Sequence, residues 1–168
     1  MSWPTLELDR VARLRVLSRA LPGVALEERT IAAPFDVVWD FVSDLSNSVP
    51  RFDRDVASIE ILERHGDRLK IISRPPLIPI PVRLDVELRA GWCWMVARPQ
   101  LYVVGMAAVP AGAHTRFAML EGVSLTGSKV LRPTLGPVHA ISRWRHRRHL
   151  PRDLDAIERA LGLRAALE

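Results

Sequence analysis

Cysteine and lysine are scarce in this sequence of 168 residues, and long apolar runs are absent. Cys93 is the single cysteine, which excludes an internal disulfide and a cysteine-rich metal site. No run approaches the roughly eighteen apolar residues of a membrane-spanning helix, and the start lacks a cationic segment followed by an apolar stretch. We therefore expect a protein of the reducing cytoplasm.

Motifs of several enzyme classes are missing as well. The sequence holds no activated-serine motif, no phosphate-binding loop and no paired-carboxylate motif. With 48% hydrophobic and 26% charged residues, the composition is that of an ordinary globular domain. At this length a single core can bury about 70% of the surface of the unfolded chain.

The charge that is present is mostly arginine. Lys70 and Lys129 are the only lysines, yet the net charge is +5 and the isoelectric point is near 10.5. Such a balance admits nucleic acid or an anionic membrane as a partner, but on its own it concerns solubility and association rather than fold.

An amphipathic basic helix is predicted over residues 5–21, with Thr5 as its N-cap. Val11, Leu14 and Leu17 recur at a spacing of three, and Pro22-Gly23 ends the helix. We interpret residues 1–23 as an N-terminal helical extension and residues 24–168 as the main domain. The sequence leaves open which of three surfaces the apolar face of this helix packs against: its own domain, a second copy in a homodimer, or a membrane. The first two are favoured.

The main domain begins with a strand over 24–32, a short helix over 35–44 and a turn-rich connection over 47–52. Apolar residues then alternate with period two, which predicts six strands at 56–63, 68–74, 82–89, 92–98, 101–109 and 114–122. Four prolines between Pro75 and Pro81 exclude a central strand there. Successive hairpins imply one antiparallel sheet.

A long helix is predicted over residues 134–161, bent at Pro151. Its residues Leu150, Leu154 and Ile157 form a stripe that must lie on an apolar surface. The last three strands are apolar on both faces, which fits one face against a helix or cavity and the other only partly exposed. The order of elements predicts an α+β fold, a curved antiparallel sheet with the long helix across its concave face.

Short motifs at both ends of the main domain resemble one family. They are Ile31-Ala32-Ala33-Pro34, Val38-Trp39, Asp44-Leu45, Val49-Pro50-Arg51-Phe52, His114-Thr115-Arg116 and Arg152-Asp153-Leu154. These segments resemble the START-like (Bet v 1-like, SRPBCC) superfamily with the helix-grip fold, and within it the bacterial polyketide cyclase/dehydrase-like branch. The likeness covers about residues 24–162, with His114 at a position where the family has glycine.

The resemblance implies a deep apolar cavity between the sheet and the long helix, used for lipids, sterols, polyketides or aromatic compounds. Candidates for its lining are large side chains on the late strands, for each of which a filled core is the alternative. They are Trp94, Tyr102, Met106, Phe117 and Met119. The inward face of the Trp92 and Trp94 strand is left open.

Two titratable residues are further candidates for the cavity. Glu121 shares the parity of Phe117 and Met119, and a carboxyl group in an apolar pocket would have a raised pKa. A solvated position at a frayed strand end is its alternative. His139 on the long helix is a candidate to face the cavity, with a core or surface position as its alternative.

His146 and His149 lie three residues apart on the long helix, a spacing that suits two metal ligands. No cysteine or carboxylate with metal-ligand spacing is recognised beside them, and the flanking arginines would repel a cation. We therefore expect no metal and no cofactor.

The basic run from Arg143 to Arg152 has three interpretations. It is a solvated helix face, or a contact of Arg143, Arg147 and Arg148 with an anionic membrane, or a nucleic-acid contact. No nucleic-acid motif accompanies the run, so nucleic acid is not an expected partner.

Three functional hypotheses follow. The first is a cytoplasmic domain that binds, and in one version transports, a hydrophobic small molecule. The second is a cyclase/dehydrase-type enzyme in which Glu121, Tyr102 or His139 moves a proton. The third is an interaction module that acts through the N-terminal helix, at a membrane or in a dimer.

Overall fold

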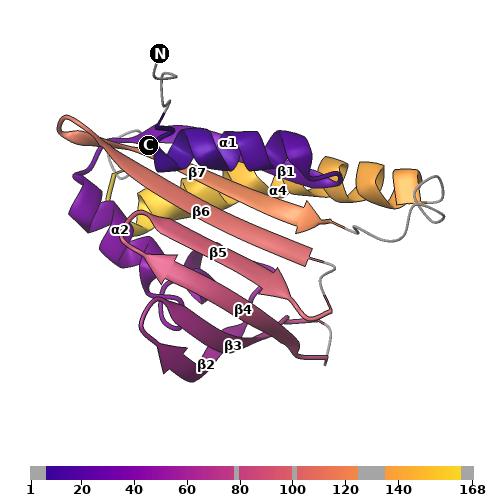
Figure 1. The fold of residues 1–168 in the computed structure, drawn as a ribbon. Coiled ribbons are helices and arrows are strands. Elements are labelled where there is room, and N and C mark those ends of the chain that lie inside the picture. Colours follow the sequence, from indigo (N-terminus) through magenta and orange to yellow (C-terminus); the bar gives the residue numbers. More distant parts are fainter. Residues whose placement is uncertain (1–6, 78–79, 100–101, 125–134, 164–168) are drawn as a thin grey trace, which may run out of the picture.

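A single antiparallel sheet of seven strands organises the protein (Figure 1). The computed structural model describes residues 7–77, 80–99, 102–124 and 135–163. The elements in chain order are α1 (Arg10–Ala20), β1 (Val24–Ile31), α2 (Phe35–Ser43), α3 (Val49–Phe52), β2 (Ser58–His65), β3 (Arg68–Arg74), β4 (Val82–Arg89), β5 (Trp92–Ala97), β6 (Tyr102–Ala111), β7 (His114–Val123) and α4 (Gly136–Ala160). The strand order is β1-β7-β6-β5-β4-β3-β2, so β1 and β2 are the two edges.

The predicted α+β architecture is confirmed, and the boundaries of its helices differ from the prediction. Helix α1 begins at Arg10, because the carboxylate of Asp9 accepts a hydrogen bond of 2.8 Å from the backbone N–H of Ala12 and caps the helix. Thr5 and residue 134, the expected starts of the first and last helices, lie outside the described residues. The connection over 47–52 contains the short helix α3.

The inner face of the sheet holds helix α4, whose predicted apolar stripe is confirmed. Leu150, Leu154 and Ile157 are fully buried in the core formed with the inward side chains of the strands. Beyond the stripe, the guanidinium of Arg29 on β1 pairs with Asp155 at 2.7 Å and Glu158 at 3.1 Å. Pro151 lies inside the helix, directly after Leu150 and before Asp155 and Glu158.

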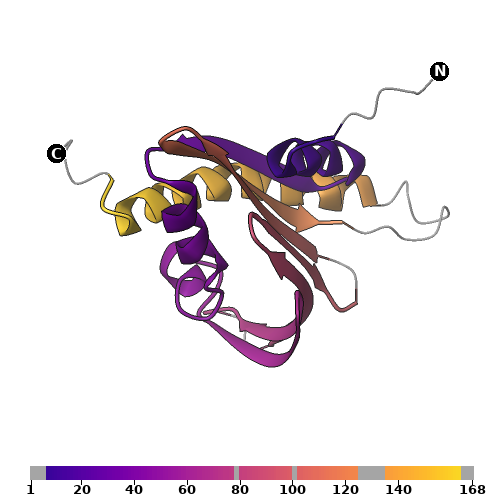
Figure 2. The same ribbon diagram turned by 60° about the vertical axis from the view of Figure 1, so that its left-hand side comes forward.

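The outer face of the sheet is covered by helix α1, which explains why the late strands are apolar on both faces. Val11 and Leu14 are fully buried in a second core with Trp92, Val103 and Leu120. The sequence predicted that this face is partly exposed to solvent. In the structure α1 buries it more fully. Figure 2 shows the strong curvature of the sheet, with α1 over its outer side.

Close packing of α1 on the sheet depends on Gly105 in β6. A Cβ atom at this position would lie 2.6 Å from Cδ1 of Leu14 and 3.0 Å from the ring of Trp94. A glycine therefore lets the helix approach the strand backbone. The apolar face of α1 is thus occupied within its own chain.

Some of the family-like motifs have a visible structural role. The hydroxyl of Thr115, which is fully buried, donates a hydrogen bond of 2.8 Å to the carbonyl of Ala33, between β1 and α2. Pro34 is the N-cap position of α2, and the side chain of Asp44 accepts from the backbone N–H of Asn47 after that helix. These contacts fix the turns on either side of α2.

Edge strand β2 is irregular. Its pairing with β3 shifts register between Ile61 and Glu63, and all of its residues except Ile59 are exposed. Among the described residues, no helix combines the length and the apolar character needed to cross a membrane.

Candidate functional site

A cavity of about 410 Å³ lies between the inner face of the sheet, α3 and α4. Most of its lining is apolar: Val49, Phe52, Val56, Ile59, Ile71, Pro75, Pro76, Leu77, Val82, Leu84, Met95, Val104, Met106, Met119 and Val123. The polar lining residues are Asp53, Asp55, Ser73, Tyr102, Glu121, Arg145 and His146. The volume is that of a small-molecule site.

Four of the seven residues predicted for the lining are found there. They are Tyr102, Met106, Met119 and Glu121. The other three, Trp94, Phe117 and His139, are not lining residues of this cavity. Glu121 is 1% exposed, so the strand does not fray at this point and the solvated alternative is wrong.

The three remaining residues have other positions for clear reasons. Trp94 lies on the outer face, stacked on Trp92 with ring centroids 6.3 Å apart, because residues of even number on β5 point toward α1. Phe117 is fully buried in the inner core. His139 packs against Gly23. A Cβ atom added to Gly23 would lie 2.8 Å from Cδ2 of His139.

Three titratable side chains meet at the polar part of the cavity. The hydroxyl of Tyr102 on β6 donates a hydrogen bond to Oε1 of Glu121 on β7. His146 on α4 faces the same pair, with its Nε2 3.5 Å from the Tyr102 hydroxyl and 3.9 Å from Oε1 of Glu121. The sheet and the helix thus present an acid, a phenol and an imidazole to one another.

The hydrogen bonds of His146 determine which of its nitrogens is free. Its Nδ1 lies 2.7 Å from the backbone carbonyl of Ser142, an acceptor that requires Nδ1 to carry the proton. Burial lowers the pKa of His146, an effect that this carbonyl partly opposes. At neutral pH Nε2 is therefore an unprotonated acceptor that faces Tyr102 and Glu121.

The surroundings of Glu121 favour the neutral form of its carboxyl group. Burial, together with the nearby charge of Asp53, raises its pKa well above the ordinary value. Its Oε2 is buried and has no hydrogen-bond partner among the described residues. A protonated carboxyl group in an apolar cavity can act as a proton donor.

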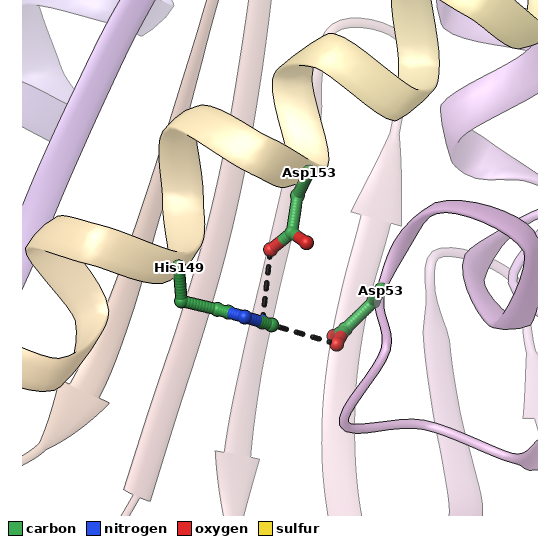
Figure 3. A group of neighbouring side chains, drawn as sticks. All are labelled: Asp53, His149 and Asp153. Atoms are coloured by element: carbon green, nitrogen blue, oxygen red, sulfur yellow. Dashed lines mark hydrogen bonds and ion pairs between the residues drawn. The ribbon is translucent and has the colours of Figure 1, made fainter.

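An ion cluster joins α3 and α4 next to this group (Figure 3). Nε2 of His149 lies 2.9 Å from Oδ2 of Asp153, one turn later on α4, and 3.3 Å from Oδ1 of Asp53, which follows α3. It is also 4.0 Å from Oε2 of Glu121. Hydrogen bonds to Asp153 and Asp53 raise the pKa of His149 to about 10, whereas burial raises the pKa of Asp153 to about 6.

The cluster places one potential metal-ligand atom from each of Asp53, His149 and Asp153 within 4.8 Å of one another. The expectation that no carboxylate joins the histidines was wrong, since Asp153 lies four residues after His149. A metal ion would compete with the proton of His149 for the lone pair of Nε2. In the structure the group is a set of ion pairs that joins α3 to α4.

Sequence reasoning missed His146 as a cavity residue and Asp53 and Asp153 as partners of His149. The signal was present in α4, where the buried positions are Ser142, His146, Leu150, Asp153, Leu154 and Ile157. The apolar stripe continues toward the N-terminus by steps of four, from Leu150 to His146 and Ser142. A stripe defined by apolar residues alone begins at Leu150, so it does not include the buried polar positions Ser142 and His146.

Similarity to solved structures agrees with the fold. The aromatase/cyclase Zhui from Streptomyces sp. R1128 superposes with a TM-score of 0.61 and 16% identity, over 86% of this chain and 97% of that one. A START superfamily protein from Mycobacterium smegmatis gives 0.55 and 13%, over 83% and 97%. StfQ, a di-domain ARO/CYC from the steffimycin biosynthetic pathway, gives 0.62 and 13%, over 94% of this chain and 56% of StfQ.

No family model matches the sequence. One curated protein does, named "Putative polyketide cyclase" and found in Streptomyces halstedii, with 36% identity over 94 residues. The match covers 56% of this chain and 74% of that protein. The chain belongs to the polyketide cyclase-like family. The predicted resemblance is therefore confirmed, and the seven-stranded sheet with its long helix is the helix-grip fold of these START-like proteins.

Proposed function

We propose that this START-like protein binds a largely apolar, polyketide-like molecule in its cavity and catalyses proton transfer on it. The observation that carries the proposal is the group of Tyr102, Glu121 and His146 in an otherwise apolar lining. The relative in Streptomyces halstedii, named as a polyketide cyclase, supports the reaction class.

Binding would draw its free energy from the apolar walls. Burial of apolar surface contributes about 25 cal/mol per Å², and Met95, Met106 and Met119 give the lining a side chain that adapts to irregular ligands. The polar group at one part of the cavity favours a ligand with a ketone or hydroxyl oxygen there, because a buried donor without a partner costs free energy.

Ring closure of a ketone chain needs a base and an acid. The base removes a proton from a carbon next to a carbonyl, the freed electron pair forms the new carbon–carbon bond, and the attacked carbonyl oxygen takes up a proton. Nε2 of His146 has the lone pair for the first transfer, and protonated Glu121, hydrogen-bonded to Tyr102, has the proton for the second. Return of the proton from the His146 imidazolium to the Glu121 carboxylate restores both groups. His146 can then remove a second proton from the carbon next to the carbonyl while Glu121 protonates the new hydroxyl, which leaves as water.

The test is turnover of a freshly made poly-β-keto chain, followed by chromatography of the cyclised products. We expect Glu121→Gln and His146→Phe to lower the rate about a hundredfold, the lower end for general acid–base catalysis. His65→Asn is the matched control, because the side chain of His65 is 82% exposed. Near-ultraviolet circular dichroism verifies the fold of each variant.

The alternative function is binding or transport without chemistry. Native mass spectrometry of the freshly purified protein distinguishes the two by identifying a co-purified ligand. A bound apolar molecule, combined with equal product yields with and without the protein, contradicts catalysis and supports the carrier function. If His146→Phe turns over the substrate at the wild-type rate, His146 takes no part in the reaction. Action in the cytoplasm remains a prediction, as does a homodimer.

A further inference from the structure

The N-terminal half of α4 exposes apolar and cationic side chains next to one another. Ile141 is 65% exposed and Trp144 is 58% exposed. Arg143, Arg147 and Arg148 are exposed beside them. We call these five residues the α4 rim.

The charge of the α4 rim is not neutralised by the part of the chain that the structure describes. The sequence has no acidic residue from Gly136 to Arg152. Among the described residues, no carboxylate pairs with Arg143, Arg147 or Arg148. The guanidinium of Arg148 lies 4.4 Å from the ring centroid of Trp144. One face of the indole is therefore covered by a cation.

The α4 rim borders the cavity. Arg145 lines the cavity, and Ile141 lies one helical turn before it on the same side of α4. Leu77, after β3, also lines the cavity and is 93% exposed, and Ile80 is 67% exposed. The four most exposed large hydrophobic side chains of the described residues are Leu77, Ile80, Ile141 and Trp144.

We propose that the α4 rim docks on the surface of an anionic phospholipid membrane, with the cavity beside the contact. Exposed tryptophan and isoleucine side chains suit the boundary between headgroups and acyl chains, and the arginines are complementary to the anionic lipids. An apolar ligand could then pass between bilayer and cavity without crossing water. This docking goes beyond the proposed chemistry and does not depend on it.

Another surface and other types of partner are less suited than the α4 rim and a membrane. The apolar face of α1 is buried against the sheet, with Val11 and Leu14 fully covered. Stacking of nucleic-acid bases uses free aromatic faces, and Arg148 covers one of the two faces of Trp144, which leaves a single face for a base. An acidic protein is the remaining type of partner, and the test includes it.

The experiment measures flotation of the full chain with vesicles of phosphatidylcholine alone or mixed with phosphatidylserine. We expect binding to the mixed vesicles at low salt and weaker binding at high salt. Each arginine near an anionic surface contributes a factor of about five, so the triple variant R143Q/R147Q/R148Q should bind about a hundredfold less. The double variant I141S/W144S should also lose binding.

The matched control is R19Q/R64Q/R68Q, which removes the same charge from exposed arginines on α1 and the β2–β3 hairpin. It should bind like the wild type, and unchanged thermal unfolding and Nile red binding show that the variants keep their fold and cavity. Equal loss in the control would overturn the proposal, because the binding would then follow net charge. Absence of vesicle binding at low salt would also overturn it, as would binding to polyglutamate but not to vesicles.

Discussion

His149 shows how one side chain can hold two elements together. It is the shared partner of Asp53 after α3 and Asp153 on α4. Asp153 is 1% exposed, so the loss of the imidazolium would leave a buried carboxylate without its cation. Removal of one partner from a buried ion pair is costly.

We expect His149→Asn to lower the free energy of unfolding by about 3 kcal/mol or more. His65→Asn, on an exposed strand end, should change it by less than about 0.5 kcal/mol. Urea unfolding at neutral pH measures both. A small effect at His149 would show that Asp53 and Asp153 are solvated in solution.

The contribution of His149 should also depend on pH. Its pKa is about 10 in the folded protein, raised by the hydrogen bonds to Asp153 and Asp53, and about 6.5 in the unfolded chain. A raised pKa gives stability that is fully present below about pH 6.5 and is lost as the pH rises toward about 10. The difference between wild type and His149→Asn should therefore shrink over this range in urea unfolding series. A difference that grows instead would contradict the assignment.

His146 predicts a pH dependence of the opposite kind. Burial lowers its pKa below the ordinary value near 6.5, and only the unprotonated form can accept a proton from substrate. The pH profile of kcat/KM should thus fall on the acidic side, with a midpoint below about 6.5. The residual activity of His146→Phe should not fall on the acidic side. If the fall persists in this variant, it belongs to the titration of another group.

At the scale of elements, α1 is the part whose role changed most between sequence and structure. Its amphipathic pattern predicted an apolar contact but could not name the partner, since the pattern is the same for a sheet, a second subunit or a membrane. The structure places the contact on β6 and β7, where Leu14 of α1 lies against Gly105.

We expect Gly105→Val to lower the free energy of unfolding by about 2 kcal/mol, because the added side chain meets Leu14 and Trp94. Limited proteolysis should release α1 more readily from this variant. Gly136→Ala is the matched control, since no atom lies within 4 Å of a Cβ at that position. Equal proteolysis of both variants would mean that α1 can shift without detaching.

Strands were easier to predict than the site because their evidence is local. Alternation within six to ten residues defined β4 and β7 to within a residue or so of their observed ends. The site combines side chains from β6, β7 and α4, and the curvature that brings Tyr102 to His146 is a property of the whole sheet. Glu121 was found because it shares the parity of Met119, whereas no local pattern linked Asp53 to α4.

At the scale of the whole molecule, the cavity distinguishes a ligand-binding protein from a protein whose interior is filled by side chains. Met119 and Met106 line it, whereas the neighbouring Phe117 fills the core, so parity alone could not divide them. The same side of a strand can face both empty space and packed side chains where the sheet curves.

We expect Val104→Trp to fill part of the cavity and to weaken the binding of Nile red more than tenfold, because the ligand would lose apolar contact area. Val16→Trp adds the same side chain to the exposed side of α1, where Val16 is 50% exposed, and should leave the dissociation constant unchanged. Fluorescence titration measures both. Unchanged binding by Val104→Trp would place the dye outside the cavity.

The irregular edge strand β2 has a consequence for behaviour at high concentration. An open edge invites a strand of another molecule to pair with it. In β2 the register shift between Ile61 and Glu63 interrupts the hydrogen-bonding row, and Glu60 and Glu63 hold their charges there in pairs with Arg74 and Lys70. Because a bulge and charged side chains both oppose such pairing, β2 protects the protein from edge-to-edge polymerisation, and loss of the bulge would favour fibrous aggregates.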